Sequence, residues 1–433
     1  MSDAIPFDAL QETFDANGGA AGIQALLERL RADGSPHGVF RALLLKKRME
    51  LGLPLINPGD LSDFPDSVRK AYESYVEETC RQTGLEYLKD GKIVEAWRYF
   101  RSVGDRQPIR EALEKVDPQG ATDETLHIAL DEGVHPRRGF ELVLKRDGLC
   151  RTITLFDSAR GVDLAVRKHV AGLMAGELYT ELVIGVSKQI FERFGEIPPE
   201  TDLVDLIRHR PWLFENANTH ADPTHISAVS RYGLLSDTQP EQIMTLSINE
   251  YGKLLDKRFG AATDAPFEDG FLDHIKYARA LLGENVDDAV DHFTAKLSGY
   301  DSGMDPGSIE WIVSLVYRVG QKRKALDLWL KHLSENPPEA PGLYIPSFYD
   351  LCIEAKEFEL LASTARSLGD VSAWVGAMAL SHAPSTVASS PAPLTSPTSP
   401  EPPEPPESPE SPAPPEPPES PTPPTPSGDE DLS

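Results

Sequence analysis

The sequence predicts an all-α fold followed by a C-terminal tail rich in proline and glutamate. Three observations support this prediction. Apolar residues recur at helical spacing through most of residues 1–383, and no segment shows a convincing alternation of apolar and polar residues as in a strand. Composition also changes sharply near Pro384. Residues 384–433 contain 19 of the 38 prolines and no aromatic residue, so burial cannot offset the entropy that folding this segment would cost.

The expected helices can be placed in order along the chain. Apolar spacing predicts helices over residues 22–30 and 39–51, and a long helix that begins at Asp66. Asp222 and Asp305 are each followed by proline, the pattern of an N-cap with proline at the first helical position. Residues 149–156 (LCRTITLF) are the one β-prone stretch, and their helical neighbours favour a short buried helix there.

Residues 169–190 form the most apolar stretch. They are interrupted by Glu177, Glu181 and Lys188, so a buried helix is expected rather than a membrane span. No apolar leader is evident in the acidic sequence MSDAIPFDALQETFD at the start of the chain, and no membrane partner is expected.

One segment, residues 84–108, carries a pattern of small and aromatic residues that each have a packing role. A glycine lets two helices approach closely, two aromatic residues fill the space between them, and a second glycine ends the first helix. An alanine keeps the second helix against its partner, and a proline starts the next turn. The first and second glycines are Gly84 and Gly91, and the aromatic residues are Tyr87 and Phe100. The alanine is Ala96 and the proline is Pro108.

Residues 309–337 repeat part of this pattern. Gly320, Ala325, Trp329 and Pro337 reproduce the spacing of Gly91, Ala96, Phe100 and Pro108. A similar pair lies 36 residues before Ala325 and Trp329, and another lies 36 residues after them; these pairs are Ala289 with Phe293, and Leu361 with Ala365. The pattern resembles the tetratricopeptide repeat, a helix hairpin of about 34 residues.

This resemblance implies an α-solenoid of antiparallel helix hairpins, because one hairpin cannot bury its apolar face alone. It also implies protein binding in a superhelical groove that holds a peptide or a helix. The expected divisions are N-terminal helices over 1–65, a helical repeat region over 66–270 with one clear repeat at 77–108, a repeat array over 271–383, and a disordered acidic tail over 384–433.

The net charge limits the classes of possible partner, and the cysteine content indicates the cellular compartment. The chain has 42 basic and 69 acidic residues, a net charge of −27, which argues against nucleic acid and anionic membranes as main partners. An acidic array favours a basic partner segment. Three cysteines, with no CxxC pair, indicate free thiols in a reducing compartment, so a cytoplasmic location is expected.

The tail has two interpretations. Its EPPEPPESPESP units favour polyproline II and suit a solubilising extension. Its PxxP spacing also suits a ligand of a proline-binding domain, but the tail lacks the Arg or Lys that usually anchors such ligands.

Two segments concentrate residues suited to chemistry. Residues 207–225 bring His209, His220, Asp222 and His225 close together, and imidazole and carboxylate groups are zinc and iron ligands. Their spacing matches no standard site, and Asp222 is expected to be an N-cap. The favoured interpretation is therefore an inter-helix connection whose Trp212 and Phe214 fill the core.

In residues 133–140, His135, Arg137 and Arg138 stand where a helix begins and could hold an anion. Exposed helix-start residues are the simpler interpretation. No phosphate-binding loop, nucleophile elbow or nucleophile–base pair is evident, so no catalytic residue and no cofactor is predicted. The expected function is a non-catalytic scaffold that binds a partner protein. The alternatives are a metal-dependent enzyme using residues 209–225 and a structural subunit of a larger assembly.

Overall fold

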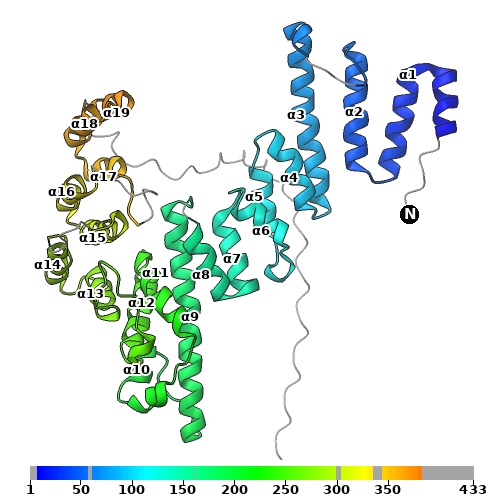
Figure 1. The fold of residues 1–433 in the computed structure, drawn as a ribbon. Coiled ribbons are helices and arrows are strands. Elements are labelled where there is room, and N and C mark those ends of the chain that lie inside the picture. Colours follow the sequence, from blue (N-terminus) through cyan, green and yellow to red (C-terminus); the bar gives the residue numbers. More distant parts are fainter. Residues whose placement is uncertain (1–6, 57–60, 160, 299–303, 335–343, 383–433) are drawn as a thin grey trace, which may run out of the picture.

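The computed structural model describes residues 7–56, 61–159, 161–298, 304–334 and 344–382. Within these residues the chain is 75% helical and contains no strand, which confirms the all-helical expectation (Figure 1). The expected tail over residues 384–433 lies outside the described residues.

The described chain contains nineteen α-helices and five short 3₁₀ helices. The first nine α-helices are α1 Phe7–Ala32, α2 Pro36–Glu50, α3 Asp66–Lys89, α4 Ile93–Ser102, α5 Gln107–Glu114, α6 Asp123–Leu130, α7 Pro136–Asp147, α8 Leu149–Ser158 and α9 Leu164–Phe194. The others are α10 Leu203–Ile207, α11 Pro223–Tyr232, α12 Gln239–Gly252, α13 Phe271–Leu281, α14 Val286–Lys296, α15 Pro306–Arg318, α16 Lys322–His332, α17 Phe348–Ala355, α18 Phe358–Ser367 and α19 Val371–His382. The 3₁₀ helices are η1 Leu61–Asp63, η2 Pro118–Gly120, η3 Pro211–Ala217, η4 Gly233–Leu235 and η5 Lys257–Phe259.

Helix starts follow the capping signals in the sequence. The Asp222 carboxylate accepts a hydrogen bond from the Thr224 backbone N–H at 2.8 Å, and Asp305 accepts one from Ser308 at 3.0 Å. Both aspartates are N-caps with proline in the first turn, as predicted. The β-prone residues 149–156 lie within α8, which confirms a helix there.

The first helix is longer than the sequence indicated. α1 begins at Phe7 and is interrupted at Gly18, where φ is +77°. The two parts then pack together, and a Cβ on Gly22 would lie only 2.4 Å from Cε2 of Phe14. Glycine at both positions therefore allows the chain to turn and the two helical segments to touch.

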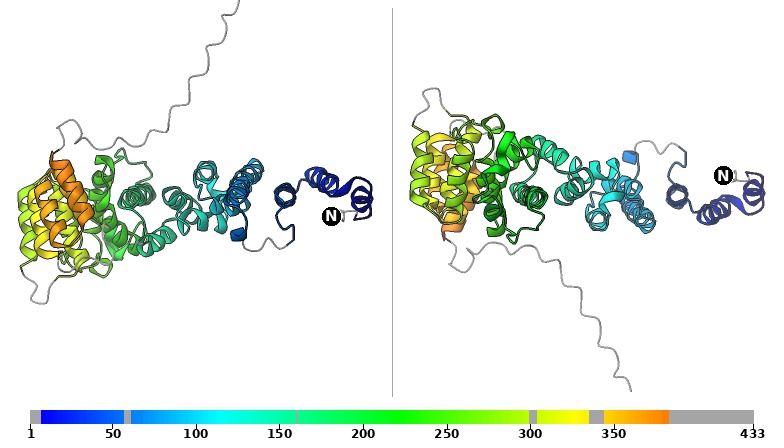
Figure 2. Two further views of the ribbon diagram at one scale, coloured as in Figure 1. Left: turned by 90° about the horizontal axis from the view of Figure 1, so that it is seen from above. Right: turned by 90° about the horizontal axis from the view of Figure 1, so that it is seen from below.

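Helices that follow one another in the chain lie against one another in space (Figure 1). The helices α1 and α2 lie at one end of the molecule and α9–α19 gather at the other, with the intervening helices between them (Figure 2). The largest apolar core joins residues from α7–α15, and a second core joins residues from α14–α19.

The longest helix, α9, lies in the largest core. Ten of its residues are buried, among them Met174, Leu178, Leu182 and Val186. By length and composition alone α9 would also suffice to cross a membrane. In the structure it contacts α7, α8, α10, α11 and α12, which is the packing expected of a core helix.

Candidate functional site

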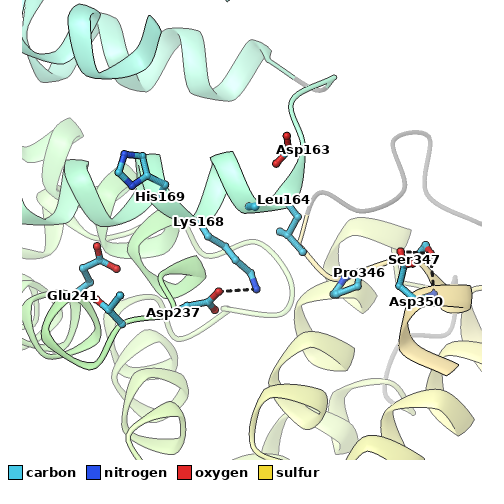
Figure 3. A pocket seen from close by; sticks show the side chains of 11 residues that line it. Asp163, Leu164, Lys168, His169, Asp237, Glu241, Pro346, Ser347 and Asp350 are labelled. Carbon is cyan, nitrogen blue, oxygen red and sulfur yellow. Dashed lines mark hydrogen bonds and ion pairs between the residues drawn. The ribbon is translucent and has the colours of Figure 1, made fainter. Parts of the chain in front are cut away.

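A cavity of about 660 Å³ lies where the starts of α9, α12 and α17 meet (Figure 3). Its volume is within the range of small-ligand and side-chain pockets. The lining comes from three segments that are far apart in the sequence: Asp163, Leu164, Ala165, Lys168 and His169; Asp237, Thr238 and Glu241; and Pro346, Ser347 and Asp350.

Arg167 helps to hold the first segment beside the third. Its guanidinium donates to the carbonyl oxygens of Phe156 at 3.3 Å and Ala159 at 3.2 Å, both near the end of α8. The same group lies 4.2 Å from the ring centre of Phe156 and 5.9 Å from that of Tyr344. Tyr344 in turn stacks on Trp311, with ring centres 4.6 Å apart. Burial lowers the pKa of Arg167, but its carbonyl partners suit the charged form.

A second arginine holds the segment before α12. Arg318, near the end of α15, donates hydrogen bonds to the carbonyl oxygens of Leu234 and Ser236. Its guanidinium also lies 3.6 Å from the Asp237 carboxylate. α15 therefore fixes the position of Asp237 at the edge of the cavity.

The cavity lining is acidic. Lys168 is its one lysine, and this side chain is already paired with Asp237 at 3.0 Å. Asp163 and the pair Ser347–Asp350 cap the starts of α9 and α17. Four carboxylates thus lie beside two cations, Lys168 and Arg318, both of which contact Asp237, and the remaining surplus of negative charge favours a cation in the cavity.

Glu241 differs from the other three carboxylates. Within the described residues it forms no ion pair and no hydrogen bond, although it is half-buried. Its carboxylate lies directly over Gly172 of α9, where a Cβ would come within 2.3 Å of the Glu241 Cδ. The missing side chain at Gly172 therefore makes room for a carboxylate whose charge no described cation neutralises.

No nucleophile–base pair lies among the residues that line the cavity. Ser347 Oγ is a helix cap that accepts the Asp350 backbone N–H at 3.2 Å, and His169 Nε2 pairs with Glu141 at 2.9 Å. Neither group is held against the other as nucleophile and base. Leu164, Ala165 and Pro346 add apolar wall, which suits the methylene stem of a long cationic side chain.

The residues of the first repeat-like segment meet at the contact between α3 and α4. Ala96 and Phe100 are buried, and Gly84 lies against the Phe100 ring. Tyr87 is half-buried and stacks on Tyr99 with ring centres 5.7 Å apart. The remaining two lie at helix boundaries: Gly91 has φ +71° just after α3, and Pro108 is in the first turn of α5.

The second repeat-like segment spans α15 and α16. Gly320 has φ +91° between the two helices, Ala325 is fully buried, and Trp329 stacks on Phe348 with ring centres 4.6 Å apart. Pro337 lies outside the described residues. The residues 36 positions away are also buried, in α14 and α18: Ala289, Phe293, Leu361 and Ala365.

The histidines of residues 209–225 have separate environments. His209 is exposed with φ +62°, while His225 lies in the first turn of α11. In the described parts of the chain no three His, Cys, Asp or Glu side chains are grouped so that they could hold a metal ion. The expected connection is present, with Trp212 and Phe214 packed against the largest core.

His220 is engaged at both ring nitrogens. Its backbone N–H donates to the Tyr251 hydroxyl at 3.0 Å, and that hydroxyl lies 2.7 Å from Nδ1. Nε2 contacts the Gln189 side-chain oxygen. This network fits a neutral ring with its proton on Nε2, and burial lowers the pKa of His220 to about 4.

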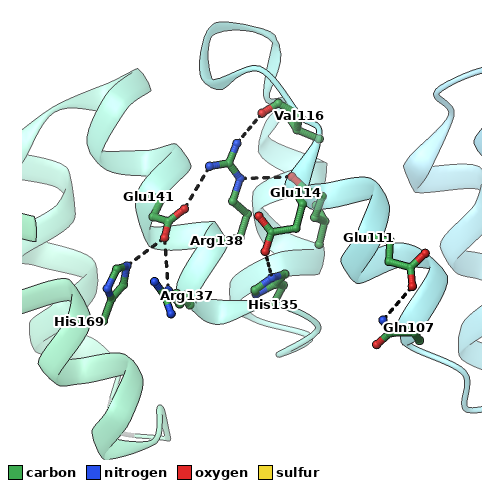
Figure 4. A network of polar contacts seen from close by, with 10 residues as sticks. Gln107, Glu111, Glu114, Val116, His135, Arg137, Arg138, Glu141 and His169 are labelled. Atoms are coloured by element: carbon green, nitrogen blue, oxygen red, sulfur yellow. Dashed lines mark hydrogen bonds and ion pairs between the residues drawn. The ribbon is translucent and has the colours of Figure 1, made fainter. Parts of the chain in front are cut away.

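The basic residues at the start of α7 link helices to one another (Figure 4). Arg138 donates to the carbonyl oxygens of Leu113 and Val116, at 3.3 and 2.8 Å, and so caps the end of α5. His135 Nε2 pairs with Glu114 at 2.6 Å. The expectation that these residues are exposed is wrong for His135 and Arg138. His135 is buried beside Glu114, and Arg138 packs against the end of α5, where the carbonyl groups accept its hydrogen bonds.

Glu141 completes this network. It accepts from Arg138 and His169, and Arg137 lies 3.5 Å away. Although burial opposes ionisation, the hydrogen bonds from Arg138 and His169 hold the pKa of Glu141 below its usual value. His135, Arg137 and Arg138, the groups that could have bound an external anion, therefore each already contact a carboxylate within the protein.

Sequence reasoning missed the cavity at the starts of α9, α12 and α17. Its local signals were only caps, such as Ser347 followed three residues later by Asp350. Those signals show where helices begin. They do not show that helix starts more than 70 residues apart in the sequence lie together in space.

Comparison with family models, with curated proteins and with solved structures finds no match. The geometry and charge of the described residues therefore carry the functional argument.

Proposed function

We propose that this protein is a non-catalytic scaffold that binds a partner protein, and that the cavity between α9, α12 and α17 receives a lysine or arginine of the partner. The observation that carries the proposal is the half-buried Glu241 carboxylate, which has no ion-pair or hydrogen-bond partner among the described residues. A cation placed there gains a charge-assisted contact without breaking an existing one.

The finer architecture belongs to the same proposal. The pairs α13–α14, α15–α16 and α17–α18 would be successive hairpins of one α-solenoid. Ala289, Ala325 and Leu361 support this interpretation because they recur every 36 residues and are all buried. Backbone geometry adds support, since Gly320 and Lys356 are 36 residues apart and both have positive φ. Such an array exposes a concave surface, the usual place for an extended partner segment.

The test uses the full chain and an array of immobilised peptides that carry Lys or Arg, Asp or Glu, or only neutral residues. We expect the wild-type protein to retain Lys- or Arg-bearing peptides, and added salt to weaken that binding. Glu241→Lys should weaken it at least tenfold, because it places a cation where the ligand's charge would lie.

Glu359→Lys is the matched control. Glu359 is exposed, also lies in a first helical turn, and has no ion pair among the described residues. Binding that Glu241→Lys leaves intact, or binding restricted to acidic peptides, would refute the cavity as the site.

A further inference from the structure

The helix α19 exposes an apolar stripe. Val371, Trp374, Val375 and Met378 are 70%, 37%, 53% and 37% exposed. Their spacing of i, i+3, i+4 and i+7 places them on one face. Ala377, roughly 60° around the helix from Trp374, is 1% exposed and belongs to the second core, so it marks the buried edge of the stripe.

Such a face is unusual at the edge of a helical array. Edge helices normally carry a polar outer surface that keeps the array soluble. α19 contains no Asp, Glu, Lys or Arg in twelve residues, in a chain of which 26% of residues are charged. An exposed apolar stripe of this kind marks a contact surface.

The sequence after α19 supplies little to cover the stripe. Residues 383–433 contain three large aliphatic side chains, Val387, Leu394 and Leu432, and no aromatic residue or methionine. They also contain nine acidic residues and no basic one. A segment of this composition does not supply a matching apolar face.

We propose that the α19 stripe binds the same stripe of a second copy of this chain, as an antiparallel helix pair about a two-fold axis. The stripe is symmetric about its midpoint between Trp374 and Val375. An antiparallel pair therefore sets Val371 of one copy opposite Met378 of the other, and Trp374 opposite Val375. This self-complementarity is what a two-fold interface requires.

Charge restricts where a second copy can bind. Each chain carries a net charge of −27, so two copies repel over most of their surfaces. α19 is free of acidic side chains and provides a surface where that repulsion is weakest. A hollow of about 440 Å³ beside Trp374, between the end of α18 and the start of α19, offers space for an apolar side chain of the partner.

The expected dimer is weak. A helix of twelve residues is roughly 18 Å long, and one face of it covers less than the roughly 800 Å² per partner of a stable interface. Dimerisation should therefore depend on concentration. This interface is separate from the proposed cation site, whose lining residues lie around the starts of α9, α12 and α17.

The test is sedimentation velocity on the full chain over about 1 to 200 µM. The wild type should shift from monomer to dimer, and Val375→Glu should weaken association at least tenfold. Gly376→Glu is the control, because it adds the same charge at an exposed position roughly 100° or more around the helix from every stripe residue, where a new Cβ meets no atom within 4 Å. A wild type that stays monomeric, equal association of all three proteins, or open-ended oligomers would each refute the proposal.

A second measurement does not depend on how the Val375→Glu variant folds. Cys80 and Cys352 are buried and Cys150 is exposed, so a Cys150→Ser background leaves no exposed cysteine among the described residues. In that background, Val375→Cys should form a disulfide-linked dimer on mild oxidation, because position 375 lies next to the two-fold axis. Gly376→Cys, on the side of α19 away from the stripe, should remain monomeric. Equal cross-linking at both positions would refute the antiparallel arrangement.

Discussion

Gly84 of α3 lies directly against the ring of Phe100 in α4, and a Cβ built on Gly84 would be 2.5 Å from Cε2 of that ring. Real Cβ atoms do not approach a carbon so closely. Phe100 is 1% exposed and cannot swing into solvent. The close approach of these two helices therefore depends on the absence of a side chain at residue 84.

The first prediction contrasts two helical glycines. Gly84→Ala should destabilise the protein by about 1–3 kcal/mol, because the new methyl group overpacks a buried ring. Gly176→Ala in α9 should stabilise it by about 0.5–1 kcal/mol. There the new Cβ meets only Met244 Cε at 4.0 Å, and alanine reduces the entropy lost on folding. Urea unfolding of both variants measures the difference, and a destabilised Gly176→Ala would contradict this account.

The second prediction concerns two alanines at equivalent places in the repeat pattern. Ala96 in α4 and Ala325 in α16 are both 0% exposed. Leucine at either position should cost about 1–3 kcal/mol of unfolding free energy, because the larger side chain must push two packed helices apart. Ala20→Leu, on the exposed surface of α1, is the control and should be close to neutral. Thermal denaturation followed by circular dichroism provides the measurement; neutral results at both buried sites would overturn the proposed repeat register.

The sequence predicted those features that depend on residues close together in the chain, namely helix ends, caps and the contact between consecutive helices. Gly91, Ala96 and Phe100 lie within ten residues of one another, so their spacing alone indicated where one helix ends and the next packs against it. The caps Asp222 and Asp305 were recognisable for the same reason, since each acts on N–H groups two or three residues away.

The cavity was not predictable in this way. Lys168, Asp237 and Asp350 are separated by 69 and 113 residues, and each alone looks like an ordinary surface charge. They meet because Arg167 and Arg318 join segments that only the path of the whole array brings together. The inward position of Arg138 had a similar origin, because its partners are carbonyl groups at Leu113 and Val116.

The third prediction concerns Lys356, which has φ +59° between α17 and α18. It stands 36 residues after Gly320, whose φ is +91°. A lysine in this left-handed region is strained, whereas glycine is not. Lys356→Gly should therefore stabilise the protein by roughly 0.5–1 kcal/mol, after the entropic cost of glycine is included. Lys356→Ala keeps the strain and should change the melting temperature little. The third prediction fails if both variants lower the melting temperature equally.

The last prediction concerns pH and His220. Burial lowers the pKa of this ring to about 4 in the folded protein, against an ordinary value of 6.5. Between these two values the unfolded chain binds a proton at this residue and the folded chain does not. His220 should therefore contribute a loss of stability as pH falls from 6.5 towards 4, and no further loss below that range.

His220→Gln should flatten this part of the stability curve, because glutamine has no proton to bind. His209→Gln is the control within the same segment, since His209 is exposed and has no hydrogen bond among the described residues. Urea unfolding of the wild type and both variants at several pH values between 4 and 7 compares the slopes. If His220→Gln leaves the slope between pH 6.5 and 4 unchanged, the ring is not held neutral by burial, and the network with Tyr251 and Gln189 does not fix its protonation state.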